Sequence, residues 1–269
     1  MATAMTKKRG RNSIVLLLSL VYLLWLPHVT SLSFDYNFSN PTTPDAINYT
    51  GDATAAGDRI DLTRDANWST GWVSNRQPVR LWDDSTGMVA SFTSNFTFAI
   101  KANSSSQADG MAFFVRPYNW SLPQDSRGGY LGLVNNPNNS ANTYFPPAVG
   151  VEFDTNRNVW DPTNTINHVG VDVNNITSAA YTALPDGCFN GTMSAWVRYE
   201  ASSKNLSVTL GFNDLPQLSL YNVSATVDFK DSGLPQDVAV GFSGATGDLT
   251  ELHQILTWSF ESSFTTGGK

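Results

Sequence analysis

The sequence predicts an all-β protein with the architecture of a β-sandwich. Nine short runs rich in β-branched and aromatic residues recur along the chain, with turn residues between them. No long segment sustains the 3.6-residue apolar period of an amphipathic helix. A chain of 269 residues with 41% hydrophobic content can also bury a sizeable core. Together these observations favour a single sandwich domain.

The expected strands follow one another at short intervals. In chain order they span residues 91–100, 111–116, 149–154, 168–173, 194–199, 206–212, 225–229, 238–243 and 255–260. Residues 194–200 and 205–210 are separated only by residues 201–204, which predicts a hairpin. The asparagine-rich segment 135–142 is expected to be the internal loop most prone to disorder. Residues 265–269 are expected to form a flexible tail.

The first 31 residues have the pattern of a signal peptide. Four basic residues precede the apolar run 14–26, and this run is shorter than the roughly 20 residues that span a bilayer. We expect cleavage after Ser31, which leaves a domain over residues 32–264. No second long apolar run follows, so we expect no membrane span and a secreted protein, either extracellular (apoplastic) or vacuolar.

Charge and cysteine content narrow the class of protein. The formal net charge is −7, and removal of the basic leader makes the chain more acidic still. An acidic chain without basic clusters is a poor binder of nucleic acid or of anionic membranes. The single cysteine, Cys188, cannot form an internal disulfide and is expected to be a small, partly buried residue.

Glycosylation sequons are dense along the chain. Asn-x-Ser/Thr occurs at Asn37, Asn48, Asn67, Asn95, Asn103, Asn119, Asn138, Asn175, Asn190, Asn205 and Asn222. A composition rich in Ser, Thr and Asn generates some of these matches by chance. We expect several of the others to carry glycans, which makes the secreted chain a glycoprotein.

The segment 152–168 combines metal-ligating residues with strand patterns. Glu152 and Asp154 project from the same face of an expected strand, and His168 begins the next one. Asp161 lies in the loop between them. This mixed oxygen and nitrogen set suits a transition ion such as manganese, Mn²⁺.

The same loop offers an all-oxygen set for a second ion. Asp154 and Asp161 supply carboxylates, the Asn158 side chain supplies an amide oxygen and Asn156 supplies a backbone carbonyl. Calcium, Ca²⁺, prefers such ligands. Two adjacent cations would neutralise carboxylates that otherwise repel one another. The alternative is a solvated acidic loop, which explains neither His168 nor the flanking strands.

The spacing of these residues resembles that of the legume-type (L-type) lectins of plants. The resemblance continues through residues 169–174 and Ser178, and it covers about residues 32–264. It implies a jelly-roll sandwich with a flat back sheet and a curved front sheet, and a carbohydrate-binding protein without catalysis. It assigns manganese to Glu152, Asp154, Asp161 and His168, with Ser178 bound through water. It assigns calcium to Asp154, Asn156, Asn158 and Asp161.

The resemblance also implies a sugar site. Asp109 follows Ala108 in the dipeptide that has a cis bond in the family, and it becomes the hydrogen-bond acceptor. The glycine loop places the backbone N–H of Gly129 at the sugar, the amide of Asn158 is a donor, and Asp248 and Leu249 lie in the specificity loop. His253 is expected to be structural.

One position departs from the family pattern. The family usually has Phe or Tyr two residues before the site asparagine, where it stacks on the sugar, whereas this chain has Asn156. Trp160 is the nearest replacement, with packing under the loop as the alternative. Loss of a ring costs on the order of 1 kcal/mol, which weakens binding without abolishing it. The preference for mannose/glucose or galactose stays open.

Two other functions compete with glycan binding. A jelly-roll glycoside hydrolase needs two carboxyl groups with distinct roles, but segment 152–156 has no further Glu on the same face, and metal binding would keep its carboxylates charged. A defence or storage protein that has lost sugar binding is consistent with Asn156. The resemblance also leaves open a homodimer formed through the back sheets, which glycans at the sequons would obstruct.

Overall fold

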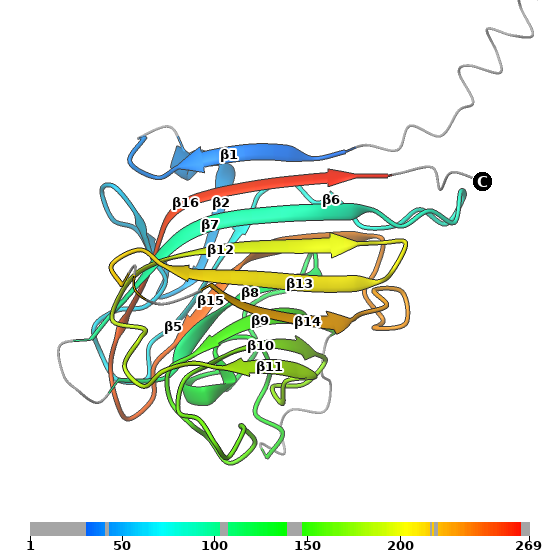
Figure 1. Ribbon diagram of the computed structural model, residues 1–269. Coiled ribbons are helices and arrows are strands. Elements are labelled where there is room, and N and C mark those ends of the chain that lie inside the picture. Colours follow the sequence, from blue (N-terminus) through cyan, green and yellow to red (C-terminus); the bar gives the residue numbers. More distant parts are fainter. Residues whose placement is uncertain are drawn as a thin grey trace, which may run out of the picture. The chain divides into compact units, whose positions relative to one another are not determined.

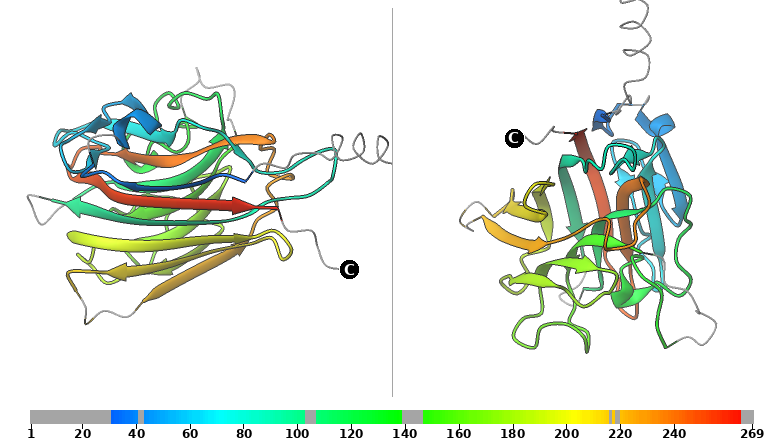
Figure 2. Two further views of the ribbon diagram at one scale, coloured as in Figure 1. Left: turned by 90° about the horizontal axis from the view of Figure 1, so that it is seen from above. Right: turned by 90° about the vertical axis from the view of Figure 1, so that its right-hand side faces the viewer.

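Two antiparallel sheets pack face to face in this protein (Figures 1 and 2). The computed structural model describes residues 31–40, 43–102, 107–138, 147–215, 217 and 220–264. Each sheet contains eight strands within this part of the chain. The expected jelly-roll sandwich is confirmed.

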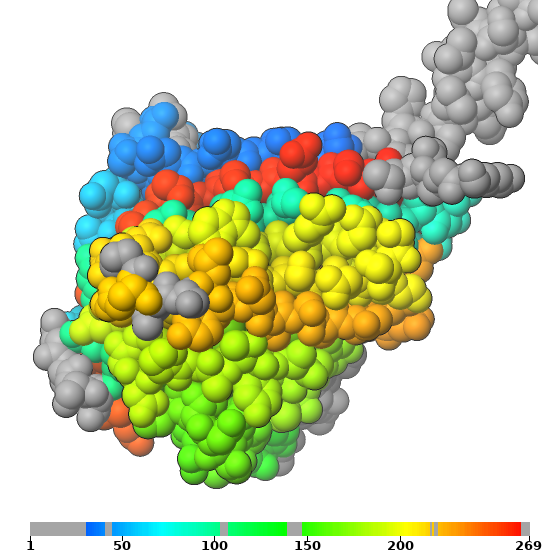
Figure 3. All heavy atoms as spheres, viewed as in Figure 1, coloured from blue at the N-terminus to red at the C-terminus, as the bar shows by residue number. Residues whose placement is uncertain are grey.

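The back sheet is formed mainly by long strands that differ widely in sequence position. Its order is β14-β13-β12-β7-β16-β4-β3, with β1 also paired to β16. Figure 3 shows β1, β16, β7, β12, β13 and β14 as adjacent bands on one face of the molecule. The strands are β1 (Ser33–Asn37), β3 (Thr54–Ala55), β4 (Ile60–Asp61), β7 (Ser91–Lys101), β12 (Gly191–Glu200), β13 (Asn205–Phe212), β14 (Tyr221–Thr226) and β16 (Leu252–Ser263).

The front sheet carries the segments that contain the expected site. Its order is β11-β10-β9-β8-β15-β5-β2, with β6 also paired to β15. The strands are β2 (Ile47–Gly51), β5 (Thr70–Asn75), β6 (Val79–Arg80), β8 (Gly110–Pro117), β9 (Val149–Asp154), β10 (His168–Val173), β11 (Ala180–Ala183) and β15 (Asp237–Ala245). Two short 3₁₀ helices, η1 (Thr43–Ala46) and η2 (Gly128–Tyr130), lie in the connections.

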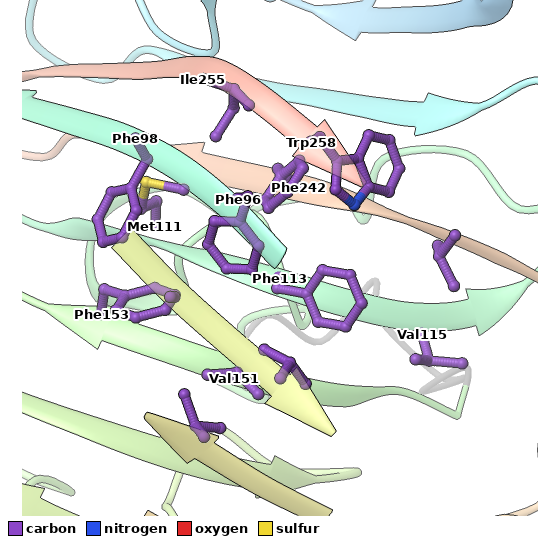
Figure 4. Packing of buried hydrophobic residues seen from close by; sticks show 14 of the residues in the cluster. Phe96, Phe98, Met111, Phe113, Val115, Val151, Phe153, Phe242, Ile255 and Trp258 are labelled. Atoms are coloured by element: carbon purple, nitrogen blue, oxygen red, sulfur yellow. The ribbon is translucent and has the colours of Figure 1, made fainter. Parts of the chain in front are cut away.

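The main core fills the space between the sheets. Strands β7 and β13 alternate buried with less buried residues, as expected for strands with one face in the core. Aromatic rings make many of the contacts: the rings of Phe96 and Phe242 lie 4.8 Å apart, and those of Phe242 and Trp258 lie 4.9 Å apart (Figure 4). This core fixes the position of the front-sheet strands that carry the site.

A second, smaller core covers the opposite face of the front sheet. Every residue of β8 and β9 is buried, so these strands are covered on both faces. Leu131 and Leu133, in the segment after η2, pack there with Phe114 and Trp72. Arg116 is fully buried in the same layer, with its guanidinium 5.0 Å from the Trp72 ring centroid. Loops therefore cover the outer face of the front sheet and bury polar groups on it.

Most of the strand predictions are confirmed, including the hairpin of β12 and β13. The expected strand 225–229 is wrong in its boundaries, because β14 covers Tyr221–Thr226. Val227 and Phe229 are buried, but they fill the core from the connection that follows the strand. Strands β1 to β6 and β11 were not predicted, since each has six residues or fewer and short strands carry weak alternation.

Several expectations fall wholly or partly on residues that the structure does not describe. The leader 1–31, apart from Ser31, the tail 265–269, the Asn103 sequon and part of the segment 135–142 lie outside the described residues. Among the residues that are described, no helix is long and apolar enough to cross a bilayer. Cys188 is more buried than expected, and burial raises the pKa of its thiol to about 12.

Candidate metal and carbohydrate site

A group of ionisable side chains lies where β9 ends and β10 begins. The antiparallel register pairs His168 with Asp154 and Gly170 with Glu152. Because side chains alternate between the two faces of a strand, Glu152, Asp154 and His168 share one face. One ligand atom from each of these three residues lies within 4.8 Å of the others, and all three residues are buried. The fold thus brings together three of the expected metal ligands.

Protein groups alone do not satisfy the polar atoms of this cluster. Glu152 Oε1 lies 3.0 Å from His168 Nε2 and accepts a hydrogen bond from the Ser178 hydroxyl. Within the described part of the chain, Glu152 Oε2, Asp154 Oδ2 and His168 Nδ1 are buried without a hydrogen-bond partner. Burial, followed by the charge of Glu152, raises the pKa of Asp154 well above its usual value. A bound cation would offset this cost, so the donor set fits a metal.

The loop after β9 folds back on its own carboxylates. The backbone N–H of Asn156 donates to Asp154 Oδ1 over 2.8 Å, and that of Asn158 donates to Asp161 Oδ2. The side-chain oxygen of Asn158 is buried and has no hydrogen-bond partner among the described residues. Burial raises the pKa of Asp161, although the hydrogen bond from Asn158 opposes this. Asp161 lies outside the compact group of three, although the charges of Glu152 and His168 act on it.

One buried carboxylate of this cluster was not predicted from the sequence. Asp172 is 1% exposed, and burial together with the Glu152 charge raises its pKa well above the usual value. The signal was present in the sequence, because Asp172 stands four residues after His168 on the same strand face. Gly170 lies between them. A Cβ atom there would lie 2.3 Å from Ser178 Oγ and 2.4 Å from Glu152 Oε1, so only glycine leaves room for the cluster.

Asp109 lies at the start of β8, beside the metal-binding loop. The Ala108–Asp109 peptide bond is cis, as the resemblance implies. The Asp109 residue is 4% exposed, and its backbone oxygen accepts a hydrogen bond from Thr155 N–H over 3.1 Å. Burial raises the pKa of Asp109 to about 6, a hydrogen bond from Asn156 lowers it, and the charge of Glu251 raises it further. Asp109 is therefore hydrogen-bonded to the segment that follows β9.

Three glycines bring the main chain close to the side chains of Asn158 and Asp109. A Cβ atom on Gly129 would lie 2.0 Å from Asn158 Oδ1, and one on Gly247 would lie 2.8 Å from Asp109 Oδ2. A Cβ atom on Gly128 would lie 3.7 Å from the same Asp109 oxygen. The sequence-based expectation assigned a role to Gly129 alone, although Gly128 and Gly247 border predicted site residues. Gly129 and Gly247 therefore have no room for a side chain, whereas a Cβ atom on Gly128 would make an ordinary van der Waals contact.

The expected specificity loop lies on the far side of Asp109. The Asn67 side-chain amide donates to the backbone oxygens of Gly247 and Asp248, over 3.2 and 2.5 Å. The charge of Asp248 contributes to raising the pKa of Asp109, and Leu249 is 38% exposed. Of the five residues expected to contact sugar, Gly129 therefore lies against Asn158, Asp248 lies close enough to act on Asp109, and Leu249 follows Asp248 in the chain.

Comparison with known proteins agrees with this arrangement. A family model described as legume lectin domain matches residues 31–268. The chain belongs to the legume lectin family. Lectin 7 of Medicago truncatula is 38% identical over 95% of this chain and 98% of its own length.

Solved structures of legume lectins share the fold. The basic winged bean lectin, determined with Tn-antigen, has a TM-score of 0.77 and 36% identity, covering 87% of this chain and 99% of that lectin. The lectin from Bauhinia forficata, in complex with GalNAc, has a TM-score of 0.75 and 33% identity, covering 87% and 100%. Members of the family bind carbohydrate without catalysis, so this chain is a carbohydrate-binding protein and not an enzyme. The family also generally binds metal ions and is typically secreted or vacuolar.

The aromatic residue that many legume lectins place over the sugar is not replaced by Trp160. The Trp160 ring stacks on Tyr130, with 4.9 Å between the ring centroids and an interplanar angle of 26°. Both rings pack against the smaller core. Of the two alternatives for Trp160, packing under the loop is therefore the one observed.

A buried polar network supports this lectin site from beneath. Glu251 Oε1 accepts a hydrogen bond from Thr155 Oγ1 over 2.6 Å and lies 2.8 Å from His253 Nε2. His253 Nδ1 lies 2.9 Å from Thr63 Oγ1. Thr155 stands between Asp154 and Asn156, so the network ties the metal loop to β16. His253 has the structural environment that the sequence suggested, and the role of Glu251 was missed.

Proposed function

We propose that this chain is a secreted lectin in which Ca²⁺ and Mn²⁺ organise one glycan-binding site. The convergence of Glu152, Asp154 and His168, with buried atoms that no described protein group satisfies, carries the proposal. Asn158 lies in the loop that follows β9, and Asp109 directly precedes Gly110, which pairs with Asp154. Bound cations would neutralise the buried carboxylates and so fix the loop that presents the sugar contacts.

Each ion would take the ligands that suit its chemistry. Mn²⁺ would be held by the set that contains nitrogen, namely Glu152, Asp154, Asp161 and His168, with Ser178 bound through water. Ca²⁺ would be held by oxygens of Asp154, Asn156, Asn158 and Asp161. Asp154 and Asp161 are shared between the ions, which couples the occupancy of the two sites.

The sugar would be held by a small set of fixed polar groups. Asp109 accepts hydrogen bonds from sugar hydroxyls, and the Gly129 N–H and the Asn158 amide donate to them. Asp248 and Leu249 border the site and select among sugars. Of the two classes, mannose/glucose and galactose, the galactose type is the first to test, because the similar Bauhinia forficata lectin was solved with GalNAc.

A glycan array with and without metal tests the proposal. The purified protein should bind a defined class of glycan, lose binding after dialysis against a chelator, and regain it when Ca²⁺ and Mn²⁺ are returned. Elemental analysis of the native protein should find both ions. Binding that persists after complete metal removal would contradict the mechanism.

Two isosteric variants separate the sugar contact from the metal site. Asp109→Asn should retain both ions but weaken glycan binding by on the order of 100-fold. The reason is that a charged carboxylate, which only accepts hydrogen bonds, becomes a neutral amide with one acceptor oxygen and one donor nitrogen. Asp237→Asn, at the distant end of β15, should retain both ions and binding. If both variants bind glycan as well as the wild-type protein does, Asp109 is not a sugar contact.

A lectin-like defence or storage protein with lost binding is the second candidate. Asn156 favours it, because the residue leaves no ring at the family's stacking position and Trp160 is engaged by Tyr130. The array decides between the two functions: metal-loaded protein that binds no glycan would support the second.

Secretion and glycosylation complete the proposal. We propose that residues 1–31 are removed as a signal peptide, that residues 32–264 form the lectin domain with a flexible tail at 265–269, and that several sequons carry glycans. Asn95 is exposed on the outer face of the back sheet, next to Trp196 on β12. Trypsin releases residues 81–101, in which Asn95 is the one sequon, so its occupancy can be read directly by mass spectrometry.

The state of Asn95 also tests the homodimer. A dimer formed through the outer faces of the back sheets would need Asn95 free of glycan, because the residue lies on the central strand β7. We therefore expect such a dimer in sedimentation experiments only for protein whose 81–101 peptide is unmodified. Thr97→Ala removes the sequon and Thr97→Ser keeps it, which gives a matched pair.

A further inference from the structure

An open hollow lies beside the proposed sugar site, and none of the residues that line it is among the proposed metal ligands or sugar contacts. It has a volume of about 340 Å³ and is lined by Trp68, Asp125, Arg127, Tyr130 and Asn136. Two of these residues are aromatic and three are polar or charged. Sugar rings are recognised by this combination, since an aromatic face takes the C–H side of the ring and polar groups take the hydroxyls.

The hollow adjoins Asp109 through two short links. The Trp68 N–H donates to the Gly247 backbone oxygen over 3.2 Å, and a Cβ atom on Gly247 would lie 2.8 Å from Asp109 Oδ2. Arg127 is followed directly by Gly128, whose Cβ would lie 3.7 Å from the same oxygen. Two residues that line the hollow, Trp68 and Arg127, are therefore joined directly to glycines that lie close to the Asp109 carboxylate.

Trp68 is the aromatic residue available there. The residue is 48% exposed. Tyr130 also lines the hollow, but it is partly buried and stacked on Trp160. Trp68 is therefore the more exposed of the two rings that line the hollow, and it comes from a loop far from Asn156 in the sequence.

The backbone around the hollow is held in an unusual conformation. Trp68, Asp125 and Leu131 have positive φ angles of 59°, 50° and 54°, although none is glycine. Bulky residues rarely adopt this conformation, and such residues cluster at ligand-binding sites where tertiary contacts hold them. Here the Asn67 amide holds the Trp68 segment against Gly247 and Asp248. The exposed indole is thus presented from a fixed loop.

We propose that this hollow is a subsite for the second ring of a bound oligosaccharide, which would stack on Trp68 while the terminal sugar engages Asp109. The inference rests on the proposed function and deepens it, because it names glycans of two or more rings as the ligand class. Hydroxyl groups of the second ring would meet the polar side chains of Asp125, Arg127 and Asn136.

A glycan on the chain itself is a competing occupant of the hollow. Asn67 begins a sequon, and a glycan attached there would lie close to Trp68. However, the Asn67 amide nitrogen donates to two backbone oxygens, and its glycosylated form would retain only one N–H. We therefore expect Asn67 to be unmodified, which peptide mapping of the native protein checks.

The test compares affinities for one ring and for several. Metal-saturated protein is titrated by calorimetry with the best-bound oligosaccharide of the array and with the methyl glycoside of its terminal sugar. Trp68→Ala should weaken oligosaccharide binding by about tenfold, as loss of an aromatic contact predicts, and should change methyl glycoside binding by less than twofold. Trp68→Phe should retain most of the affinity for the oligosaccharide.

A matched control exists within the chain. Trp120 is also the middle residue of an Asn-Trp-Ser sequence and is 42% exposed, but it follows the opposite end of β8 from Asp109. Trp120→Ala should leave both affinities unchanged. If Trp68→Ala destabilises the fold, Trp68→Gly removes the ring while accepting the positive φ.

The outcomes separate this inference from the proposed function. If the wild-type protein binds no glycan, the proposed function itself fails. If it binds and the Trp68 variants retain full oligosaccharide affinity, the subsite is wrong and the rest of the site stands. Equal weakening of both ligands would also overturn the subsite, because it would assign Trp68 to the shape of the first site. A glycan found on Asn67 would give the hollow to the protein's own sugar.

Discussion

The outer faces of the two sheets differ in how far their polar side chains are exposed to solvent. On the back sheet, outward residues such as Asn95 and Trp196 are exposed, and their polar atoms meet solvent. On the front sheet, the corresponding face lies under loops and contains Glu152, Asp154 and Asp172 with almost no exposure. The same sandwich therefore has one face that tolerates polar residues freely and one on which every polar group needs a partner. The difference indicates that the front face is shaped for bound ions.

Glycine replacement should show the largest difference between the faces. Gly170→Ala, on β10, would place a methyl group against Ser178 Oγ and Glu152 Oε1, and we expect metal affinity to fall at least about 100-fold because the cluster must move apart. Gly211→Ala, on β13, meets only side-chain atoms, the nearest at 3.1 Å from Leu220, and should cost less than about 1 kcal/mol. Calorimetric metal titration and thermal unfolding measure both. Normal metal binding by Gly170→Ala would show that the cluster is not the ion site.

Neutralising one carboxylate on each sheet should affect metal binding only on the front sheet. Glu152→Gln removes a buried charged ligand, so we expect metal affinity to fall by at least about 10-fold, with glycan binding following it. Glu261→Gln changes an exposed residue on β16 and should alter stability by less than about 0.5 kcal/mol. Elemental analysis after dialysis gives the metal content of each variant. Equal metal content would contradict the assignment of Glu152.

The pH dependence of stability should have opposite signs on the two faces when metal is absent. Burial raises the pKa of Asp154 well above its usual value and that of Asp109 to about 6, so the folded state binds these protons more tightly than the unfolded state. The metal-free protein should therefore lose stability as pH rises from about 4 through 6 and beyond. For Glu200 on the back sheet, hydrogen bonds from Arg198 and Ser91 lower the pKa, which favours the fold as pH rises.

Thermal unfolding of the chelated protein at a series of pH values checks this sign. Returning both ions should reverse it, because metal binds the deprotonated carboxylates. A metal-free protein that becomes steadily more stable from pH 4 to pH 7 would show that the buried front-sheet carboxylates are not the dominant groups.

Removal of single hydroxyl groups should give the smallest effects. Thr155→Val deletes the buried hydrogen bond to Glu251 and leaves Glu251 Oε1 with its contact to His253 Nε2, at a cost of about 1–3 kcal/mol. Thr209→Val on the back sheet deletes an exposed hydrogen bond to Asn222 and should cost at most about 1 kcal/mol. Chemical denaturation measures both. Equal costs would mean that the Glu251 network does not support the site.

Local patterns were sufficient for the adjacent back-sheet strands β7, β12 and β13 and for the loop between β9 and β10. Strands β7, β12 and β13 alternate clearly in the sequence because one of their faces meets water. Glu152, Asp154 and His168 were predicted together because a short loop joins two strands whose ends must be adjacent. In both cases the relevant contacts lie close together along the chain.

Contacts between distant segments could not be predicted in the same way. The environment of Trp160 depended on Tyr130, thirty residues earlier, and the Glu251 network joins residues 63, 155 and 253. The hollow beside Asp109 is formed by Trp68 together with residues 125–136, and no periodicity in the sequence connects these segments. Each of these contacts depends on how the loops roof the front sheet.

The family resemblance supplied Asp109 as the expected acceptor, whereas side-chain types and their spacing were enough to predict an all-β chain and a loop with paired carboxylates and a histidine. These features depend on side-chain type and on alternation, which short-range sterics convert directly into a shared strand face. The tertiary structure alone decided which polar groups are buried without partners, which aromatic ring is left exposed beside the site, and which glycines let the loops approach. Burial is a property of the packed layers, because it requires a second segment to exclude water from the first.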